Sequence, residues 1–236
     1  MPLPATVGAL RTGLWLRPAC VPKPGVTSFG SIYVGVLMRP RRTFDALVRD
    51  DRKVRFGAYG IAIAAALYGA VYFFLAHNGG RPTVLVPWLA IPAEEYYRWN
   101  LYMNAPSTVL AWVAAAGFAH LAARALGGRG DYESVLGTLG LAVSVAMWST
   151  GLHDVVTTCM GYVGALDQRA YEDAMNDGST GPGALIRALM LLYVGAFAVL
   201  FTKAIGASHG LSVVRSSCAG VLGFVVFQGL YFLFNR

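Results

Sequence analysis

Long runs of apolar residues, separated by short polar or glycine-rich segments, recur along this chain. The clearest run covers residues 56–75 and contains no charged side chain. At a rise of about 1.5 Å per residue, about 20 apolar residues cross the roughly 30 Å of hydrocarbon in a bilayer. Three more runs cover residues 101–123, 184–205 and 216–235, and a fourth begins near Ser134. The pattern predicts an all-α fold, a polytopic transmembrane bundle of five spans.

The run that begins at Ser134 has no clear end. Its apolar character continues to Leu166 and is interrupted by His153 and Asp154. Because this length exceeds one ordinary membrane-spanning helix, we expect a tilt, a kink or an extra turn at the surface, and we place the membrane exit near His153. A polar loop is expected next, and it ends at the helix-breaking residues 181–183.

The chain before residue 56 divides into two parts. Residues 1–27 hold five prolines without sustained periodicity, which predicts an irregular N-terminal extension; an acid-free, basic composition leaves an organellar transit segment as the alternative. Residues 28–55 predict two short, basic amphipathic helices, interrupted at Pro40 and with Thr43 capping the second. These helices lie on an anionic membrane face or pack as a hairpin on the bundle.

Residues 56–236 are assigned to the five-helix domain. Between its first two spans, the apolar patch at residues 84–91 is too short to cross a bilayer. Aromatic residues follow it, and aromatic side chains favour the membrane–water interface. We therefore expect this patch to rest in the interface.

Composition agrees with a membrane protein and orients it. Charged residues make up 13% of the chain, against about 25% in soluble domains, and hydrophobic residues make up 56%. Residues 1–55 contain ten of the nineteen Lys and Arg residues. With alternating sides, the basic residues predict a cytoplasmic N-terminus and an external C-terminus. We expect a bacterial inner membrane, with an organellar membrane as the alternative.

The net charge of +7 is concentrated beside the spans, so it indicates anionic lipid rather than nucleic acid as the partner. The candidates for binding lipid headgroups at the inner face are Arg39, Arg41, Arg42, Arg124 and Arg129. Other membrane proteins or a second copy of the chain are the expected protein partners. No cofactor is expected.

Few side chains offer chemistry. The candidate intramembrane polar residues are His120, His153 and Asp154, because ionisable groups in a bilayer are costly. His120 and Arg124 are four residues apart and share a helix face near the inner boundary. His153 and Asp154 are consecutive, so they point about 100° apart and are not expected to face one ligand together.

Metal binding and catalysis find little support in the spacing of residues. His77, His153 and Glu94 or Glu95 fall on the outer side, yet none shows the short spacing of metal ligands. The three cysteines are widely separated, and we expect free thiols. Residues 206–210 match G-x-S-x-G, but that motif needs a strand–turn–helix context, and here it falls in a short loop between spans.

Small residues four apart mark faces where helix backbones approach closely in lipid. The candidates for helix packing or partner contact are Gly60 with Ala64, Ala65 with Gly69, and Gly140 with Ser144. We expect these faces to build the bundle, and a face left over to dock a partner.

Three blocks, residues 37–44, 120–132 and 209–212, resemble the Yip1 domain family, particularly its bacterial and archaeal branch. The resemblance covers about residues 28–234 and implies five spans with an inner N-terminus. Eukaryotic members work in vesicle traffic with Rab-type GTPases, but their aspartate-leucine-x-glycine-proline signature is not found here. The resemblance therefore implies a fold, and the trafficking role is not carried over.

Three hypotheses of function follow. The first is a non-enzymatic membrane organiser or protein-interaction scaffold. The second is an accessory structural subunit of a larger membrane complex, respiratory or photosynthetic. The third is a small-solute or ion transporter, which requires His153 and Asp154 to line a hydrated cavity.

Overall fold

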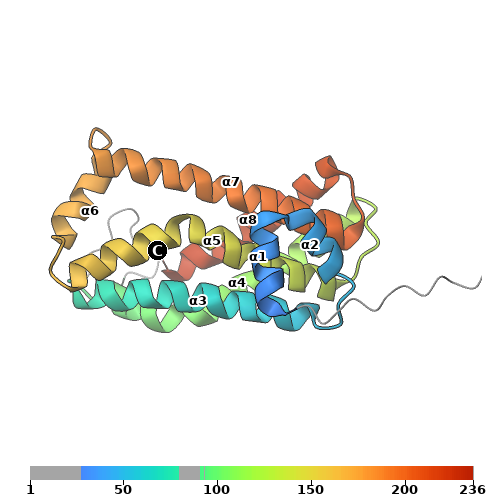
Figure 1. Cartoon of the computed structure of the whole chain (residues 1–236), viewed down its shortest axis with the longest axis horizontal. Helices are drawn as coiled ribbons and strands as arrows, with labels where there is room; N and C mark the ends of the chain where they lie inside the picture. Colours follow the sequence, from blue (N-terminus) through green and yellow to red (C-terminus); the bar gives the residue numbers. More distant parts are fainter. Residues whose placement is uncertain (1–27, 80–90, 93, 236) are drawn as a thin grey trace, which may run out of the picture.

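The computed structural model describes residues 28–79, 91–92 and 94–235. The expected extension at residues 1–27 and most of the interfacial patch at 84–91 lie outside these residues. Within the described part, the chain folds into eight helices and five of them are long and apolar enough to span a membrane, which confirms the predicted fold class. Figure 1 shows the long helices running side by side. The protein is therefore an integral, multi-pass membrane protein.

The five long helices extend beyond the predicted spans at most of their ends. They are α3 (Lys53–His77), α4 (Tyr96–Ala125), α5 (Tyr132–Tyr162), α7 (Gly181–His209) and α8 (Val213–Asn235). Helix α5 lies at the centre of the bundle, with 78% of its most apolar segment buried inside the protein, against 22% for α7. The apolar surface of α7 therefore faces outward for most of its length.

The bundle has two different ends. We call the end where α3, α5 and α8 begin the basic end, and the opposite end the cavity end. Two short helices, α1 (Phe29–Met38) and α2 (Pro40–Leu47), lie beside the basic end, and α6 (Gln168–Asn176) lies at the cavity end (Figure 1).

Helix α5 shows where the helix of the third span ends, and the membrane exit near His153 stays a prediction. It is one helix as far as Tyr162 and passes His153 without a break for about two and a half further turns. Its first turn is capped by Asp131, whose carboxylate accepts hydrogen bonds from the Ser134 backbone N–H at 2.7 Å and the Ser134 hydroxyl at 2.9 Å. The extra length therefore takes the form of a continuous helix that carries the chain to the cavity end.

The hairpin of α1 and α2 packs on the bundle, one of the two alternatives left open by the sequence. Phe44 and Leu47 of α2 are fully buried, and Tyr33 of α1 shares a hydrogen bond of 2.9 Å with Ser144 of α5. The indole of Trp148 donates to the Tyr33 hydroxyl at 2.8 Å. Apolar and hydroxyl contacts together fix the hairpin to the side of α5 and α7.

The predicted cap of α2 is wrong. Pro40 is the first residue of α2, where its missing N–H costs nothing and its fixed φ suits a helix. Thr43 lies inside the helix, and its hydroxyl donates to the Arg39 carbonyl at 3.0 Å. Proline therefore starts this helix and does not merely end the one before it.

The polar loop predicted after the third span contains a helix, α6. Asp167 caps it by accepting a hydrogen bond from the Ala170 N–H at 3.1 Å. Gln168 donates to Glu172 at 2.9 Å, and both side chains are buried. The sequence did not predict this helix, because its buried face is polar and lacks the apolar periodicity of an amphipathic helix.

Candidate functional site

At the basic end, the loop between α4 and α5 packs on the end of α7. The Gly130 N–H donates to His209 Nδ1 at 3.1 Å, and the Arg129 N–H donates to the His209 carbonyl at 3.3 Å. A Cβ at Gly130 would collide with the Ser208 carbonyl, and one at Gly128 would lie 2.7 Å from His209 Nδ1. Two of the three sequence blocks singled out above, residues 120–132 and 209–212, therefore meet in space.

The histidines at this end pair with each other. The rings of His120 and His209 have centroids 5.1 Å apart, and Tyr132 meets His120 edge-on at 5.9 Å. His120 Nδ1 and His209 Nε2 are buried and have no hydrogen-bond partner among the described residues. Arg124 is exposed at the same end of α4. The structure thus adds His209, which the sequence did not single out as a polar residue.

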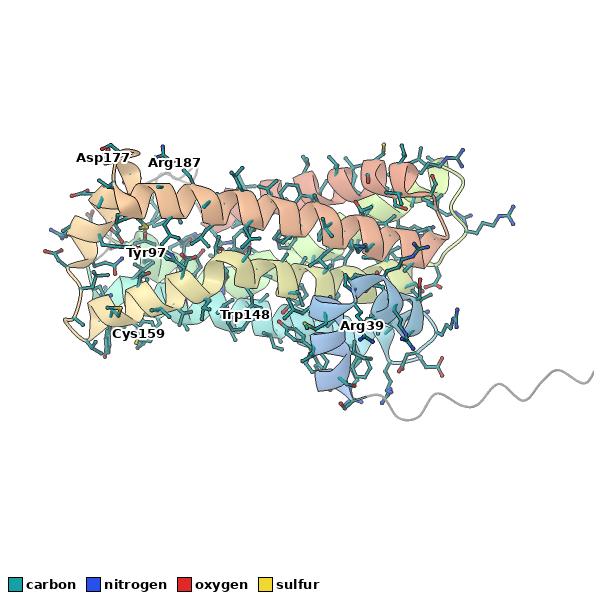
Figure 2. All side chains as sticks on the ribbon, turned by 45° about the horizontal axis from the view of Figure 1, so that its top comes forward. Arg39, Tyr97, Trp148, Cys159, Asp177 and Arg187 are labelled. Carbon is teal, nitrogen blue, oxygen red and sulfur yellow. The ribbon has the colours of Figure 1, made fainter. Side chains whose placement is uncertain are left out.

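The five arginines predicted to meet lipid headgroups are all exposed. They are Arg39, Arg41 and Arg42 in the hairpin of α1 and α2, and Arg124 and Arg129 at the end of α4 and in the loop after it. Figure 2 labels Arg39 on the hairpin. Arg215, at the start of α8, donates to the Leu126 carbonyl at 3.3 Å and adds another cation beside this loop.

A groove of about 450 Å³ lies at the basic end between α2, α7 and α8. Arg41 and Asp45 border it from α2, and Lys203 borders it from α7. Hydroxyl groups and apolar side chains complete the lining, among them Thr202, Ser216, Ser217, Val199, Leu211 and Val213. The groove therefore joins cationic, hydroxyl and apolar surface, and Lys203 enters the site through folding rather than through a local motif.

Four glycines bring α3 and α5 into backbone contact near the basic end. A Cβ on Gly57 would lie 2.7 Å from the Gly137 Cα, and a Cβ on Gly60 would lie 2.8 Å from the Gly140 carbonyl oxygen. Of the predicted small residues, Gly60 and Gly140 lie in this contact, while Gly57 and Gly137 were missed. Small residues three apart, in addition to the spacing of four, are the signal that would have found them.

The other predicted small residues lie elsewhere. Ala64 and Ser144 are fully buried. Gly69 faces α4, where a Cβ would meet the Asn104 amide nitrogen at 3.7 Å, an ordinary contact. That amide donates to the Ala65 carbonyl at 2.7 Å. A polar side chain, rather than close backbone approach, therefore joins α3 and α4 at this level.

At the cavity end, a cavity of about 180 Å³ is bordered by α3, α4, α5, α6 and α7 and by the last residue described in α8. His153 Nδ1 lies 3.0 Å from Asp154 Oδ1, and His153 Nε2 lies 2.9 Å from the Tyr171 hydroxyl. The Tyr68 hydroxyl donates to Asp154 Oδ2 at 3.5 Å. Burial and the charge of Asp154 raise the pKa of the Tyr171 phenol.

His153 and Asp154, which were not expected to face one ligand together, lie at the same cavity. Both border the cavity and both are hydrogen-bonded to each other. Their Cα–Cβ bonds diverge on α5, but the cavity extends around this side of the helix and the imidazole reaches the neighbouring carboxylate. The transport hypothesis requires the two residues to line a cavity, so this geometry keeps it as a hypothesis.

The sequence missed most of the cavity lining. Gln168 and Glu172 come from α6, and Tyr68, Tyr72, Tyr96 and Tyr97 come from α3 and α4. Figure 2 labels Tyr97 near the cavity end, where Asp177 and Arg187 also lie. In the described residues, no three His, Cys, Asp or Glu side chains are grouped to hold a metal ion. The described lining is therefore rich in aromatic and acidic side chains.

The comparisons with known proteins bear on the whole bundle. The model of the Yip1 domain matches residues 34–235. The searches of curated proteins and of solved structures returned no match. The matched residues include the hairpin from Val34 onward, the glycine contact, the loop that meets His209 and all of the described cavity lining. Because the match covers most of the chain, this protein belongs to the Yip1 domain family.

Proposed function

We propose that the protein is a non-enzymatic membrane organiser that gathers anionic lipids at its basic end. The observation that carries the proposal is the groove between α2, α7 and α8, where Arg41 and Lys203 border one space of about 450 Å³. Membership of the Yip1 family, whose members are generally non-enzymatic membrane proteins, supports it. The bacterial and archaeal branch and the inner membrane are parts of this proposal.

The groove has the chemistry of a phospholipid site. A phosphate between Arg41 and Lys203 is favoured by two cations, and the hydroxyls of Thr202, Ser216 and Ser217 border the same space as further donors. Asp45 also borders the groove, so its carboxylate offsets part of the positive charge. The apolar residues Val199, Leu211 and Val213 offer a wall for an acyl chain, which free phosphate does not need.

The exposed arginines extend this surface beyond the groove. Arg39, Arg42, Arg124 and Arg129 are all exposed near the same end of the bundle. Basic residues close to an anionic leaflet each add about 1 kcal/mol of attraction at the surface. In the proposed orientation this end faces the cytoplasm, in agreement with the positive-inside rule. Arg41 and Lys203 then select a lipid, and the other cations hold the surrounding anionic headgroups.

The test is purification from the native membrane in mild detergent, followed by native mass spectrometry. A monomer or homo-oligomer that retains phosphatidylglycerol in preference to phosphatidylcholine is the expected result. The double variant Arg41→Gln with Lys203→Gln is expected to lose that preference. The matched control, Arg98→Gln with Arg169→Gln, removes two exposed arginines of the opposite end and is expected to keep it.

Two outcomes contradict the proposal. If the protein is purified in a defined complex with other chains at fixed stoichiometry and shows no lipid preference, the accessory-subunit hypothesis is favoured over the organiser. Equal loss of phosphatidylglycerol in both double variants shows that total charge, and not the groove, holds the lipid.

A further inference from the structure

The cavity at the cavity end plays no part in the proposed function. Two carboxylates, those of Asp154 and Glu172, border the cavity, and Glu172 is 5% exposed. Of the lining residues in the described part of the chain, none is Lys or Arg, and His153 lies against the Asp154 carboxylate. The cavity therefore presents negative charge within a surface that is mostly apolar.

Two residues of the lining carry buried acceptor oxygens. Gln168 Oε1 and Asn235 Oδ1 belong to residues that line the cavity, and both oxygens are buried without a hydrogen-bond partner among the described residues. Their orientation follows from their partners, because Gln168 Nε2 donates to the Glu172 carboxylate and Asn235 Nδ2 donates to the Tyr231 carbonyl. Gln168 Oε1 lies beside Gly161, so it is the carboxylates and the aromatic rings that favour a cation.

Aromatic rings form another part of the lining. The rings of Tyr72 and Tyr97 are stacked with centroids 6.3 Å apart, and Tyr96 meets Tyr97 edge-on at 5.1 Å. Tyr68 lies beside Tyr72 at 6.2 Å and reaches Asp154 through its hydroxyl. Tyrosine faces attract cations through the ring quadrupole, and clusters of such rings recognise ammonium groups.

From these observations we propose that the cavity binds an ammonium group, placed between the carboxylates of Asp154 and Glu172 and the tyrosine rings. Ile186 and Met190 of α7 continue the cavity as an apolar wall, and Met190 is exposed on the bundle surface. An alkyl chain attached to the ammonium group has an apolar path there. A free alkylammonium and an ammonium-bearing lipid headgroup share this chemistry.

The first experiment measures binding of choline and ethanolamine to the full chain in detergent by titration calorimetry. Saturable binding of either ammonium compound is expected. The neutral isostere of choline, 3,3-dimethylbutan-1-ol, is expected to bind at least about tenfold more weakly, since it keeps the shape and loses the charge. Equal binding of the neutral compound would overturn the proposal.

Variants test whether the named residues hold the charge. Glu172→Gln keeps an acceptor for Gln168 and removes one carboxylate, and it is expected to weaken amine binding about tenfold. The control is Asp173→Asn, which removes an exposed carboxylate from the adjacent position of α6 and is expected to change nothing. Tyr97→Leu is expected to weaken binding, and Trp99→Leu, at an exposed position on the same helix, is not. Unchanged affinity in both Glu172→Gln and Tyr97→Leu would overturn the proposal.

A second experiment separates the two sources of the ammonium group. The protein is placed in nanodiscs that contain equal amounts of phosphatidylethanolamine and phosphatidylglycerol, and retained lipid is identified by native mass spectrometry. Retention of phosphatidylethanolamine that is lost in Glu172→Gln identifies a headgroup site, and binding of soluble amines alone identifies a free-amine site. Absence of both would overturn the proposal. Because Arg41 and Lys203 lie at the opposite end, their double variant tests the lipid groove without affecting this result.

Discussion

Helices α3 and α5 are joined in different ways at the two ends of the bundle. At the basic end, Gly57 and Gly60 of α3 meet Gly137 and Gly140 of α5, and the backbones touch. At the cavity end, the same two helices are joined through side chains, such as the 2.8 Å hydrogen bond between Tyr68 and Thr150 and the 2.9 Å bond from Asn78 to the Thr158 carbonyl. Small residues bring the helices together at one end, and larger polar side chains join them beside a cavity at the other.

The difference has an energetic cause. In lipid the hydrophobic effect does not drive helices together, so dispersion at short range and hydrogen bonds decide where they meet. Glycine allows the shortest approach, while tyrosine and asparagine add hydrogen bonds at a longer distance. A backbone contact leaves no space for an added atom. A contact through side chains beside a cavity leaves space for a larger side chain. The predictions below test this contrast.

The largest effect is expected from Gly57→Ala. Its Cβ would lie 2.7 Å from both the Cα and the carbonyl oxygen of Gly137, and backbone atoms have no rotamer to escape. We expect a loss of about 1–3 kcal/mol, seen as a lower unfolding temperature in detergent. The control is Gly195→Ala on α7, where nothing lies within 4 Å of the added carbon. Because alanine favours a helix more than glycine does, Gly195→Ala is expected to cause no loss, and an equal loss in both variants would show that the contact with Gly137 is not the cause.

A smaller effect is expected at the loop that joins α4 to α5. His209→Leu removes the acceptor of the Gly130 N–H and leaves a donor unpaired, which costs about 1–3 kcal/mol in a buried setting and less in this partly buried one. His209→Asn places an acceptor near the position of Nδ1 and is expected to recover part of the loss. Thermal unfolding, with hydrogen exchange of residues 127–131, distinguishes the two variants.

A still smaller effect is expected from Asp131→Ala, which removes the cap of α5 and costs about 1 kcal/mol. Burial raises the pKa of Asp131, but hydrogen bonds from Ser134 and the charge of Lys53 outweigh it, so the pKa lies below its ordinary value of 3.8. A carboxyl group whose pKa is lowered by folding stabilises the folded protein at pH values above its unfolded-state pKa. This stability is lost as the pH falls through the folded-state pKa.

The variant Asp131→Asn keeps a cap but cannot titrate. Between about pH 5 and pH 3, the unmodified protein is therefore expected to lose more stability than this variant. The effect is small because the Asp131 side chain is 59% exposed and its ion pair with Lys53, at 3.5 Å, is screened by water. Parallel pH profiles for the two proteins would contradict the assignment.

The smallest effect is expected at the cavity end. Val71→Leu adds one methylene to a residue that borders a cavity of about 180 Å³, so we expect a change in stability below about 1 kcal/mol. The comparison with Gly57→Ala is direct, because each variant adds one carbon to α3. A loss at Val71 as large as that at Gly57 would erase the contrast between the two ends.

Hydrophobic runs were sufficient to predict the five long helices, because the thickness of the bilayer fixes the number of apolar residues that a spanning helix needs. The glycine contact was half found, since Gly60 and Gly140 fit the spacing of four residues and Gly57 and Gly137 do not. Helix α6 was missed because Asp167, Gln168 and Glu172 are polar, and polar residues in this segment favour the prediction of a loop. Lys203 and His209 join their sites through packing between distant segments, which periodicity does not encode.

The hydrogen bond between Gly130 and His209 also bears on biogenesis. Its two residues are 79 positions apart in the chain. At a synthesis rate of about 5–20 residues per second, the donor leaves the ribosome about 4–16 s before its acceptor exists. The loop between α4 and α5 therefore lacks this hydrogen bond until α7 has been synthesised. A nascent chain arrested before residue 209 lacks this acceptor and carries an incomplete basic end.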